Sequence, residues 1–449
     1  MTDIVVHPLR RPLTGGVPVP SDKSIGHRAL LFGALANGVS RIRGFSRGED
    51  NVSTARAMAA MGAEITDVSE TELSVKGTGL FGLREPEGPL DCGNSGTTMR
   101  LLAGLLAAQP FKTTLIGDET LCRRPMMRVV GPLRARGAII EGKPHPSKPD
   151  NVTAPLVIGP LPEGTHLGEL EYESPVASAQ VKSAILLSGL YAHGVTRFRE
   201  PSLSRDHTER MLLAMGAPLR TVGPVVELDP AGWKGVLEPI DVDIPGDVSA
   251  AAFLLVAAAI SEGSRVTVRG VGTNPTRTGV LEILRDMGAG LEIVARGEQG
   301  GEPVAEITAW HTTLRAGRIG GEIVPRAIDE IPIVCALAAR AEGETVITDA
   351  EELRVKESDR IATMAVVLRA FGVDCDERPD GLAIRGHKGA LRPAEVDSKG
   401  DHRIAMTAAV LALHASGPTR IKDCDCIATS FPRFVGTLRA LGAEIDVPA

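Results

Sequence analysis

Two patterns of apolar and polar positions recur six times along the chain. In the first, a helical stretch with one apolar face ends at glycine and is followed by a short alternating strand. The six copies end at Gly62, Gly137, Gly216, Gly288, Gly372 and Gly442, which are 70 to 84 residues apart. Glycine is the usual residue just beyond a helix, because it adopts the left-handed conformation at low cost. The pattern therefore predicts a helix, a glycine stop and a strand in each copy.

The second pattern is a polar start followed by an alanine-rich apolar helix. The copies start at Asp22, Asn94, Ser178, Asp247, Asp329 and Asp401, at spacings of 69 to 84 residues. Such polar residues cap helix N-termini. Helices that are apolar nearly all round are buried, so we expect these six to pack closely together.

Six repeats of two helices and several short strands predict a mixed α/β repeat protein. The segment 240–253 (IDVDIPGDVSAAAF) echoes the segment 17–30 (VPVPSDKSIGHRAL), as if the fourth repeat restarts the first. We therefore expect a boundary near residues 235–246 and two similar lobes of three repeats. A cleft between two lobes is a common place for a ligand.

Composition and charge narrow the function classes. The 449 residues carry a net charge of −7, which disfavours a broad nucleic-acid-binding surface. The six cysteines form no regular framework, and the N-terminal residues lack the apolar core of a secretory signal. The longest apolar run, Ala250–Ile260, is too short to span a bilayer. We expect a cytoplasmic protein that binds neither membranes nor nucleic acids.

Basic residues follow several of the polar helix starts. They are Lys23, Arg28, Arg100, Lys182, His402 and Arg403. A helix N-terminus attracts anions through its unpaired N–H groups and its partial positive charge. The alternative is that each start is only a cap beside a solvated basic face.

Three further clusters are candidates for chemistry. Arg123 and Arg124 are a pair that suits carboxylate or phosphate, although surface arginine pairs are common. Lys356, Glu357 and Arg360 precede an amphipathic helix and place a carboxylate between two cations; the alternative is a solvated helix entry. Asp329 and Glu330 open an apolar helix, where acids favour the dipole. Among cations, Asp329 would stay ionised and could act as a base toward a hydroxyl.

These segments resemble the EPSP synthase (3-phosphoshikimate 1-carboxyvinyltransferase) family over essentially the whole chain. The matching segments are PSDKSIGHRALL, GNSGTTMRLL, RRPMMRVVGPLRARGA, SPVASAQVKSAILLSGL, SRDHTERML, AIDEIPI, ELRVKESDR, DHRIAM and IATSFP. The sequence motifs ASAQVKSA and RPMMRV resemble those of the class II subgroup, whose members tend to tolerate the inhibitor glyphosate.

The resemblance implies two similar lobes, each of three βαβαββ-type repeats with buried parallel helices, arranged as an inside-out barrel. The lobes would be residues 16–240, on the shikimate 3-phosphate side, and residues 1–15 plus 241–449, on the phosphoenolpyruvate side, with the active site in the cleft between them. It also implies transfer of the enolpyruvyl group of phosphoenolpyruvate to the 5-hydroxyl of shikimate 3-phosphate, in aromatic amino acid biosynthesis. We expect no metal, no organic cofactor and a monomer.

The resemblance also carries over site residues, motif by motif. Those matching the shikimate 3-phosphate site are Lys23, Ser24, Arg28, Ser178, Ala179, Gln180, Arg205, Asp329 and Lys356. Those matching the phosphoenolpyruvate site are Lys23, Asn94, Gly96, Arg124, Gln180, Arg360 and Arg403. Asp329, Glu357 and Lys23 are the candidates for proton transfer, and the sequence leaves their division of roles open.

Three positions bear on glyphosate. Gly96 is the residue of sensitive members, whereas Leu101 and Thr429 stand where that subgroup often has proline and lysine. We expect intermediate or appreciable tolerance of glyphosate. Two alternatives to the main interpretation remain: the related transferase that acts on UDP-N-acetylglucosamine, for which Cys122 would be the loop cysteine, and a non-catalytic anion-binding repeat protein.

Overall fold

The computed structural model describes residues 2–448 and contains six four-stranded sheets with one connectivity. In each sheet, the first two strands counted from one edge are parallel to each other. The remaining two strands continue the sheet next to the inner strand of that pair. Three sheets and their helices form each of two compact units. The N-half unit holds Ser21–Ile244 and Gln299–Gly301. The C-half unit holds Pro245–Glu298 with the chain before Ser21 and from Glu302 onward.

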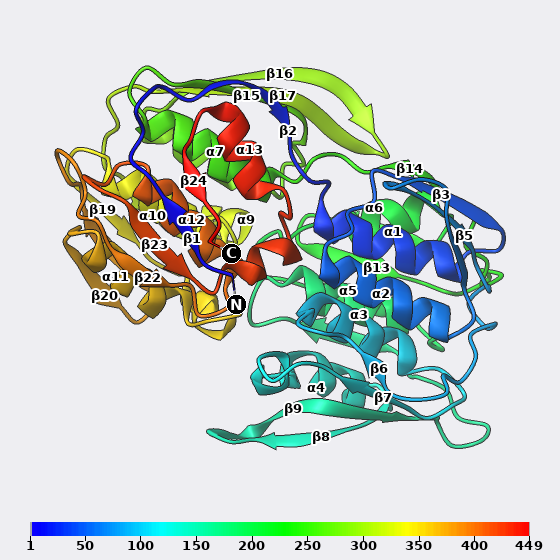
Figure 1. The fold of residues 1–449 in the computed structure, drawn as a ribbon. Helices are drawn as coiled ribbons and strands as arrows, with labels where there is room; N and C mark the ends of the chain where they lie inside the picture. Colours follow the sequence, from blue (N-terminus) through cyan, green and yellow to red (C-terminus); the bar gives the residue numbers. More distant parts are fainter. Residues whose placement is uncertain (1, 449) are drawn as a thin grey trace. The chain divides into compact units, whose positions relative to one another are not determined.

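The N-half unit is built from three sheets and six α-helices (Figure 1). Its first sheet, in the order β14-β3-β5-β4, consists of β14 (Asp241–Asp243), β3 (Val39–Arg43), β5 (Glu72–Lys76) and β4 (Glu64–Asp67). The second consists of β6 (Leu90–Asp91), β7 (Thr113–Ile116), β9 (Lys148–Gly159) and β8 (Ile139–His145), and the third of β10 (Leu170–Glu173), β11 (Thr196–Arg199), β13 (Val225–Leu228) and β12 (Leu219–Val222). The helices are α1 (Lys23–Leu35), α2 (Glu49–Ala60), α3 (Gly96–Leu106), α4 (Met127–Ala135), α5 (Ala179–Gly189) and α6 (His207–Ala214), with a 3-10 turn η1 (Leu121–Arg123).

The C-half unit repeats this plan. Its sheets consist of β16 (Gly290–Gln299), β17 (Glu302–Trp310), β15 (Arg265–Gly272) and β2 (Thr14–Pro18); of β18 (Arg318–Ile319), β19 (Glu344–Ile347), β21 (Gly381–Arg385) and β20 (Cys375–Arg378); and of β22 (Glu395–Asp397), β23 (Thr419–Lys422), β1 (Ile4–Val6) and β24 (Ile445–Asp446). Its helices are α7 (Val248–Ile260), α8 (Gly279–Asp286), α9 (Ile323–Ala327), α10 (Ile331–Ala339), α11 (Arg360–Ala370), α12 (His402–Ala412) and α13 (Phe434–Leu441), with 3-10 turns η2 (Glu351–Val355) and η3 (Cys424–Thr429).

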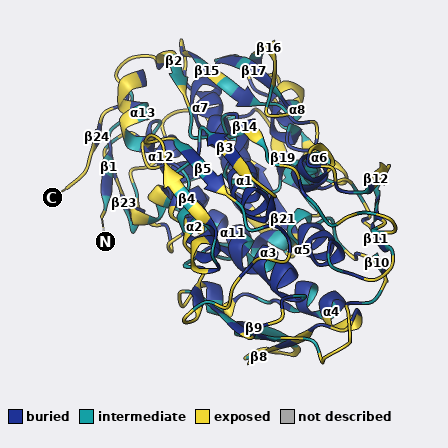
Figure 2. Ribbon diagram, turned by 90° about the vertical axis from the view of Figure 1, so that its right-hand side faces the viewer, coloured by how far each residue is buried: buried dark blue, intermediate teal, exposed yellow. Residues whose placement is uncertain are grey.

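The alanine-rich helices form the core of each unit, as the apolar pattern predicts. In the N-half unit α3 packs against both α1 and α5, and in the C-half unit α7, α10 and α12 pack against one another. Every residue of α7 and α10 is buried, and Figure 2 shows α7 in the buried colour. Among the described residues, no helix is both long enough and apolar enough to cross a membrane. The mixed α/β repeat fold expected from the sequence is confirmed.

The six glycine stops are also confirmed. Each lies just beyond or at the end of a helix with φ between +82° and +121°, and each is followed by a strand. A residue with a Cβ is strained in that conformation, which explains the recurrence of glycine there.

Two of the six predicted helix starts are placed differently. Asn94 does not cap its helix: the next residue, Ser95, accepts the N–H of Thr98. Asp329 lies in the turn between α9 and α10, and Glu330 takes the N-cap position without a side-chain capping bond. Glu330 keeps helical backbone angles (φ −93°, ψ −9°), so the extended conformation that a capping side chain needs is not formed.

The contact between α3 and α5 yields a test of the packing. A Cβ built on Gly104 would lie 2.2 Å from the carbonyl oxygen of Ala184 and 2.6 Å from its Cα. We expect Gly104→Ala to lower the free energy of unfolding by about 1–3 kcal/mol, because the two helix backbones must separate. The matched control is Gly436→Ala in α13, where a Cβ would meet nothing within 4 Å. That change should stabilise the protein by about 0.5–1 kcal/mol. Urea unfolding of both variants measures the difference, and equal effects would contradict the packing.

Candidate functional site

In the N-half unit, side-chain bonds connect the first turns of the buried helices α3 and α5. Arg100 Nη1 lies 2.6 Å from the Gln180 side-chain oxygen, and the Gln180 amide donates to the Thr97 hydroxyl at 2.8 Å. Ser178 and Ala179 are the N-cap and the first residue of α5. Gln180 is therefore held at the start of its helix, beside the N-terminus of α3.

The first turn of α1 carries the predicted residues Lys23 and Ser24. Lys23 forms an ion pair with Asp50 of α2 at 2.8 Å, and Arg205 Nη1 donates to the Ser24 hydroxyl at 3.1 Å. Arg28 lies deeper: its guanidinium is buried and donates to the hydroxyls of Thr208 and Ser183 at 2.7 Å each. The structure thus brings Lys23, Ser24 and Arg205 to the start of α1, whereas Arg28 fixes α1 to α5 and α6.

Two guanidinium groups lie close to Gly96, the first residue of α3. A Cβ on Gly96 would be 2.8 Å from Arg100 Nη1 and 3.2 Å from Arg124 Nη1. Arg124 donates to the Asn94 side chain at 2.7 Å, and the Asn94 amide in turn donates to Asp118 at 2.7 Å. Two cations beside the N–H groups of a helix start are suited to an oxyanion. The absence of a side chain at Gly96 leaves the arginines room.

Lys182 does not belong with these residues, although its place near a helix start suggested an anion site. Its ammonium is buried and forms ion pairs with Glu200 at 2.8 Å and Glu209 at 2.7 Å. Burial lowers the pKa of the lysine, but the two carboxylates outweigh it, so the pKa lies above its ordinary value. Burial raises the pKa of Glu209. Lys182 is one turn past the N-cap and faces the protein interior, where only paired charges are stable.

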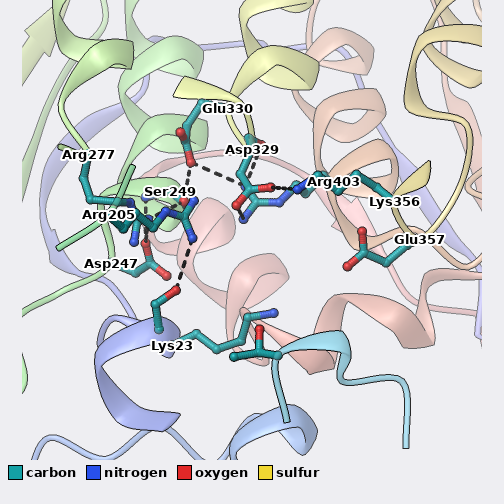
Figure 3. A network of polar contacts seen from close by, with 12 residues as sticks. Lys23, Arg205, Asp247, Ser249, Arg277, Asp329, Glu330, Lys356, Glu357 and Arg403 are labelled. Carbon is teal, nitrogen blue, oxygen red and sulfur yellow. Dashed lines mark hydrogen bonds and ion pairs between the residues drawn. The ribbon is translucent and has the colours of Figure 1, made fainter. Parts of the chain in front are cut away.

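In the C-half unit, Asp329 lies among three cations, of which Figure 3 labels Lys356 and Arg403. Its Oδ1 is 3.3 Å from Arg360 Nη1 and 3.6 Å from Lys356 Nζ. Arg403 donates to the backbone carbonyl of Asp329 at 2.7 Å, and its Nη2 is 3.9 Å from Oδ2. The Asp329 side chain is 16 % exposed, so solvent still reaches it. The cations favour the ionised carboxylate.

Arg360 is held from two further sides. Glu357 Oε2 is 2.5 Å from Arg360 Nη2, and Asp401 Oδ2 is 2.8 Å from Arg360 Nε. Burial alone would lower the pKa of Arg360, but the three carboxylates around it outweigh burial and raise the pKa. The guanidinium is therefore charged and fixed beside Asp329.

Asp401 bonds to both arginines of this cluster, to the side chain of Arg360 and to the backbone N–H of Arg403. Its carboxylate caps α12 by accepting the N–H of Arg403 at 3.0 Å while it pairs with Arg360. Burial tends to raise the pKa of Asp401, yet Arg360 more than offsets it and the pKa lies below its ordinary value. Sequence reasoning identified Asp401 only as a helix start. The signal available was an N-cap acid followed two residues later by arginine.

The predicted site residues thus fall into two groups, which we define by unit. The N-half group lies at the starts of α1, α3 and α5 and consists of Lys23, Ser24, Asn94, Gly96, Arg124, Ser178, Ala179, Gln180 and Arg205, with Arg28 buried behind it. The C-half group consists of Asp329, Lys356, Glu357, Arg360 and Arg403. Both groups have neighbours that the predicted site omitted, namely Asp50, Arg100 and Asp118 in the first and Asp401 in the second.

The buried lysine gives a prediction with a pH dependence. Lys182→Met leaves Glu200 and Glu209 without their cation and should lower the free energy of unfolding by about 3–5 kcal/mol at neutral pH. Burial already raises the pKa of Glu209, and loss of the lysine charge should hold that pKa further above its value in the unfolded chain. The deficit should therefore grow from about pH 5 to about pH 8, because the unfolded chain releases protons that the folded state retains.

The control for this variant is Lys76→Met, which removes the exposed ion pair with Glu64. Exposed pairs contribute about 0–1 kcal/mol. Chemical denaturation at several pH values compares the two variants. A Lys182→Met deficit that is small, or that shrinks as the pH rises, would contradict the buried triad.

Comparison with known proteins identifies the family of this chain. The sequence model of the family described as EPSP synthase (3-phosphoshikimate 1-carboxyvinyltransferase) matches residues 9–438. The chain is 52 % identical over 438 residues to a protein of Geobacter sulfurreducens named 3-phosphoshikimate 1-carboxyvinyltransferase, covering 98 % of this chain and 99 % of that protein. It is 52 % identical over 435 residues to the protein of the same name from Methylococcus capsulatus, covering 97 % and 96 %.

A solved structure agrees with this result. The EPSP synthase structure from Acinetobacter baumannii superposes with a TM-score of 0.85 at 42 % identity, and the match covers 100 % of both chains. A family match over nearly all of the chain, relatives at about half identity and a full-length structural match lead to one conclusion: this chain belongs to the EPSP synthase (3-phosphoshikimate 1-carboxyvinyltransferase) family.

Proposed function

We propose that the chain transfers the 1-carboxyvinyl group of phosphoenolpyruvate to the 5-hydroxyl of shikimate 3-phosphate, releasing phosphate. Family membership over residues 9–438 supports the reaction class. The observation that carries the proposal for this chain is the carboxylate of Asp329 held among Lys356, Arg360 and Arg403. A base surrounded by cations suits a reaction that joins two anionic substrates.

The starts of the N-half helices would bind shikimate 3-phosphate. Lys23, Ser24 and Arg205 offer an ammonium, a hydroxyl and a guanidinium at the first turn of α1. Ser178, Ala179 and Gln180 add the N-terminus of α5, where backbone N–H groups favour a phosphate. Arg28 contributes from behind, by holding α1 in place. From the C-half group we assign Asp329 and Lys356 to the same substrate.

Phosphoenolpyruvate brings a phosphate and a carboxylate, which suits paired guanidinium groups. We assign Arg124, Asn94, Gly96 and Gln180 of the N-half group to it, together with Lys23. The C-half residues assigned to it are Arg360, whose side chain is paired with Asp401, and Arg403, whose side chain donates to the Asp329 carbonyl. Fixed cations lower the cost of bringing two anions together and hold the reacting atoms in place.

The reaction needs one base and two proton transfers at the enolpyruvyl group. Asp329 would take the proton of the 5-hydroxyl as its oxygen bonds to C2 of phosphoenolpyruvate. The methylene carbon gains a proton in the same addition and becomes a methyl group. Phosphate then leaves C2 while the methyl group loses a proton, which restores the double bond. Glu357 and Lys23 are the groups we assign to proton transfer at the methylene carbon and the phosphate.

Replacing the proposed base tests this assignment. Asp329→Asn keeps the size of the side chain and removes its basicity, so phosphate release on mixing both substrates should slow by about 10²–10⁴-fold. The matched control is Asp286→Asn, an exposed acid at the end of α8, which should release phosphate at the original rate. No release by the unaltered chain would refute the function; undiminished release by Asp329→Asn would refute only the base.

Glyphosate inhibition provides a second test. We infer that glyphosate competes with phosphoenolpyruvate only weakly here. The inference rests on the sequence motifs around Gln180 and Arg124, which resemble those of the class II subgroup. Initial rates at several phosphoenolpyruvate concentrations measure the inhibition constant against the Michaelis constant for phosphoenolpyruvate. Competitive inhibition with a constant well above that Michaelis constant is expected. A constant far below it would contradict the inferred tolerance.

A further inference from the structure

A basic pocket of about 390 Å³ lies in the C-half unit, lined by none of the residues assigned to the substrates. Its walls come from five places in the sequence. They are the segment after β1, the loop after α7, the C-cap residue of α10, the loop at Gly389 and the residues that follow α12. Three arginines line it, Arg10, Arg11 and Arg340, against one carboxylate, Glu262. A pocket of this size and charge accommodates a small anionic molecule.

Arg340 lines this pocket and is held by two bonds to backbone carbonyls. Its Nη1 donates to the carbonyl oxygens of His387 at 3.0 Å and Gly389 at 2.6 Å. These two bonds use both Nη1 hydrogens and leave the N–H groups of Nε and Nη2. No residue in the described part of the chain pairs with those groups. The parallel Nε and Nη2 donors match the two oxygens of a carboxylate or phosphate.

The charge of Arg340 is not offset by an acid partner. Burial lowers its pKa, and neither of its two bonds is to a carboxylate. Arg11 is exposed and has no ion pair or hydrogen bond from its side chain in the described structure. Arg10 has one contact, with Glu444 at 3.6 Å, and both of these side chains are largely exposed. The pocket therefore keeps an excess of positive charge.

His414 also lines the pocket and lies near Arg340. The Ser261 hydroxyl donates to the Ala257 carbonyl at 2.6 Å, so it accepts from His414 Nε2 at 3.1 Å. That bond assigns the proton of the neutral imidazole to Nε2. Burial and then the nearby Arg340 lower the pKa of His414 to about 3. The histidine is neutral, and the arginines supply the charge.

The walls of the pocket are tied together. Leu9 N–H donates to the Leu413 carbonyl at 2.9 Å, which fixes the segment carrying Arg10 and Arg11 to the end of α12. Pro12 lies against Gly263, whose Cβ position is 3.1 Å from the proline ring. The backbone segment that carries Arg10 and Arg11 is therefore held beside the other walls of the pocket, which lowers the cost of ordering it around a ligand.

We propose that this pocket binds a small molecule carrying a carboxylate or phosphate group, held by the Nε and Nη2 donors of Arg340 and by Arg11. The site is separate in its residues from those assigned to the two substrates. A carboxylate and a phosphate both offer negatively charged oxygens to these donors. Comparing a carboxylate probe with a phosphate probe shows which of the two the pocket binds.

The experiment is titration calorimetry of the full chain at low salt, with malonate and with inorganic phosphate as the probes. The residues assigned to the two substrates should also bind these anions. The measured quantity is therefore the difference in probe binding between the unaltered chain and each arginine variant. Arg340→Gln and Arg11→Gln should each weaken binding of at least one probe about 10-fold or more at one site. Phosphate release from the two substrates should stay unchanged in Arg11→Gln.

Two comparisons decide the outcome. Arg285→Gln, an exposed arginine in the last turn of α8, is the matched control and should bind both probes like the unaltered chain. Arg340→Gln removes bonds to two carbonyls, whereas Arg11→Gln removes none, so the second variant separates ligand binding from local folding. The proposal is overturned if neither probe binds the unaltered chain, if Arg11→Gln binds both probes normally, or if Arg285→Gln loses as much.

Discussion

Close approach of helices made of small side chains is the constraint on which each unit depends. Gly104 of α3 lies so near the backbone of Ala184 in α5 that a single methyl group would not fit. In the C-half unit every residue of α7 and α10 is buried. Small side chains predominate in such contacts, in line with an aromatic content of 3 % for the whole sequence. The sheets then cover the helices, and loops at the helix starts carry the polar residues.

Burying several helices so completely also draws cations into the interior, and each is satisfied differently. Arg28 donates to hydroxyls, Lys182 pairs with two carboxylates, and Arg360 is surrounded by three. Arg136 has only hydroxyl and carbonyl acceptors, and burial lowers its pKa to about 10. Because removal of a partner from a buried charge is costly, these bonds fix the helix starts relative to one another within each unit. Arg360 differs from the other buried cations because two of its carboxylate partners, Asp329 and Glu357, are residues assigned to proton transfer.

Much of the fold could be predicted from the sequence, because its signals are local and repeated six times. A glycine with positive φ after each helix and an apolar pattern with a period near 75 residues are properties of short segments. The two displaced helix starts show the limit. Whether Asn94 or Ser95 caps α3 depends on which side chain reaches a backbone N–H, and Asn94 is engaged by Arg124 and Asp118 instead. The direction of Lys182 depends on Glu200 and Glu209, which lie outside the helix that carries the lysine, so the local pattern does not reveal it.

The division of the chain between the units has a consequence for synthesis. The first strand, β1, pairs with β23 and β24, more than 400 residues later in the sequence. On the ribosome, therefore, the N-half unit has all of Ser21–Ile244 available while the opening segment still lacks its neighbours. Domains fold as units during translation, and contacts between distant residues form late. Residues Ile4–Val6 thus lack their partner strands for most of translation, and the last strands to leave the ribosome cover them, whereas β2 meets its partner β15 earlier.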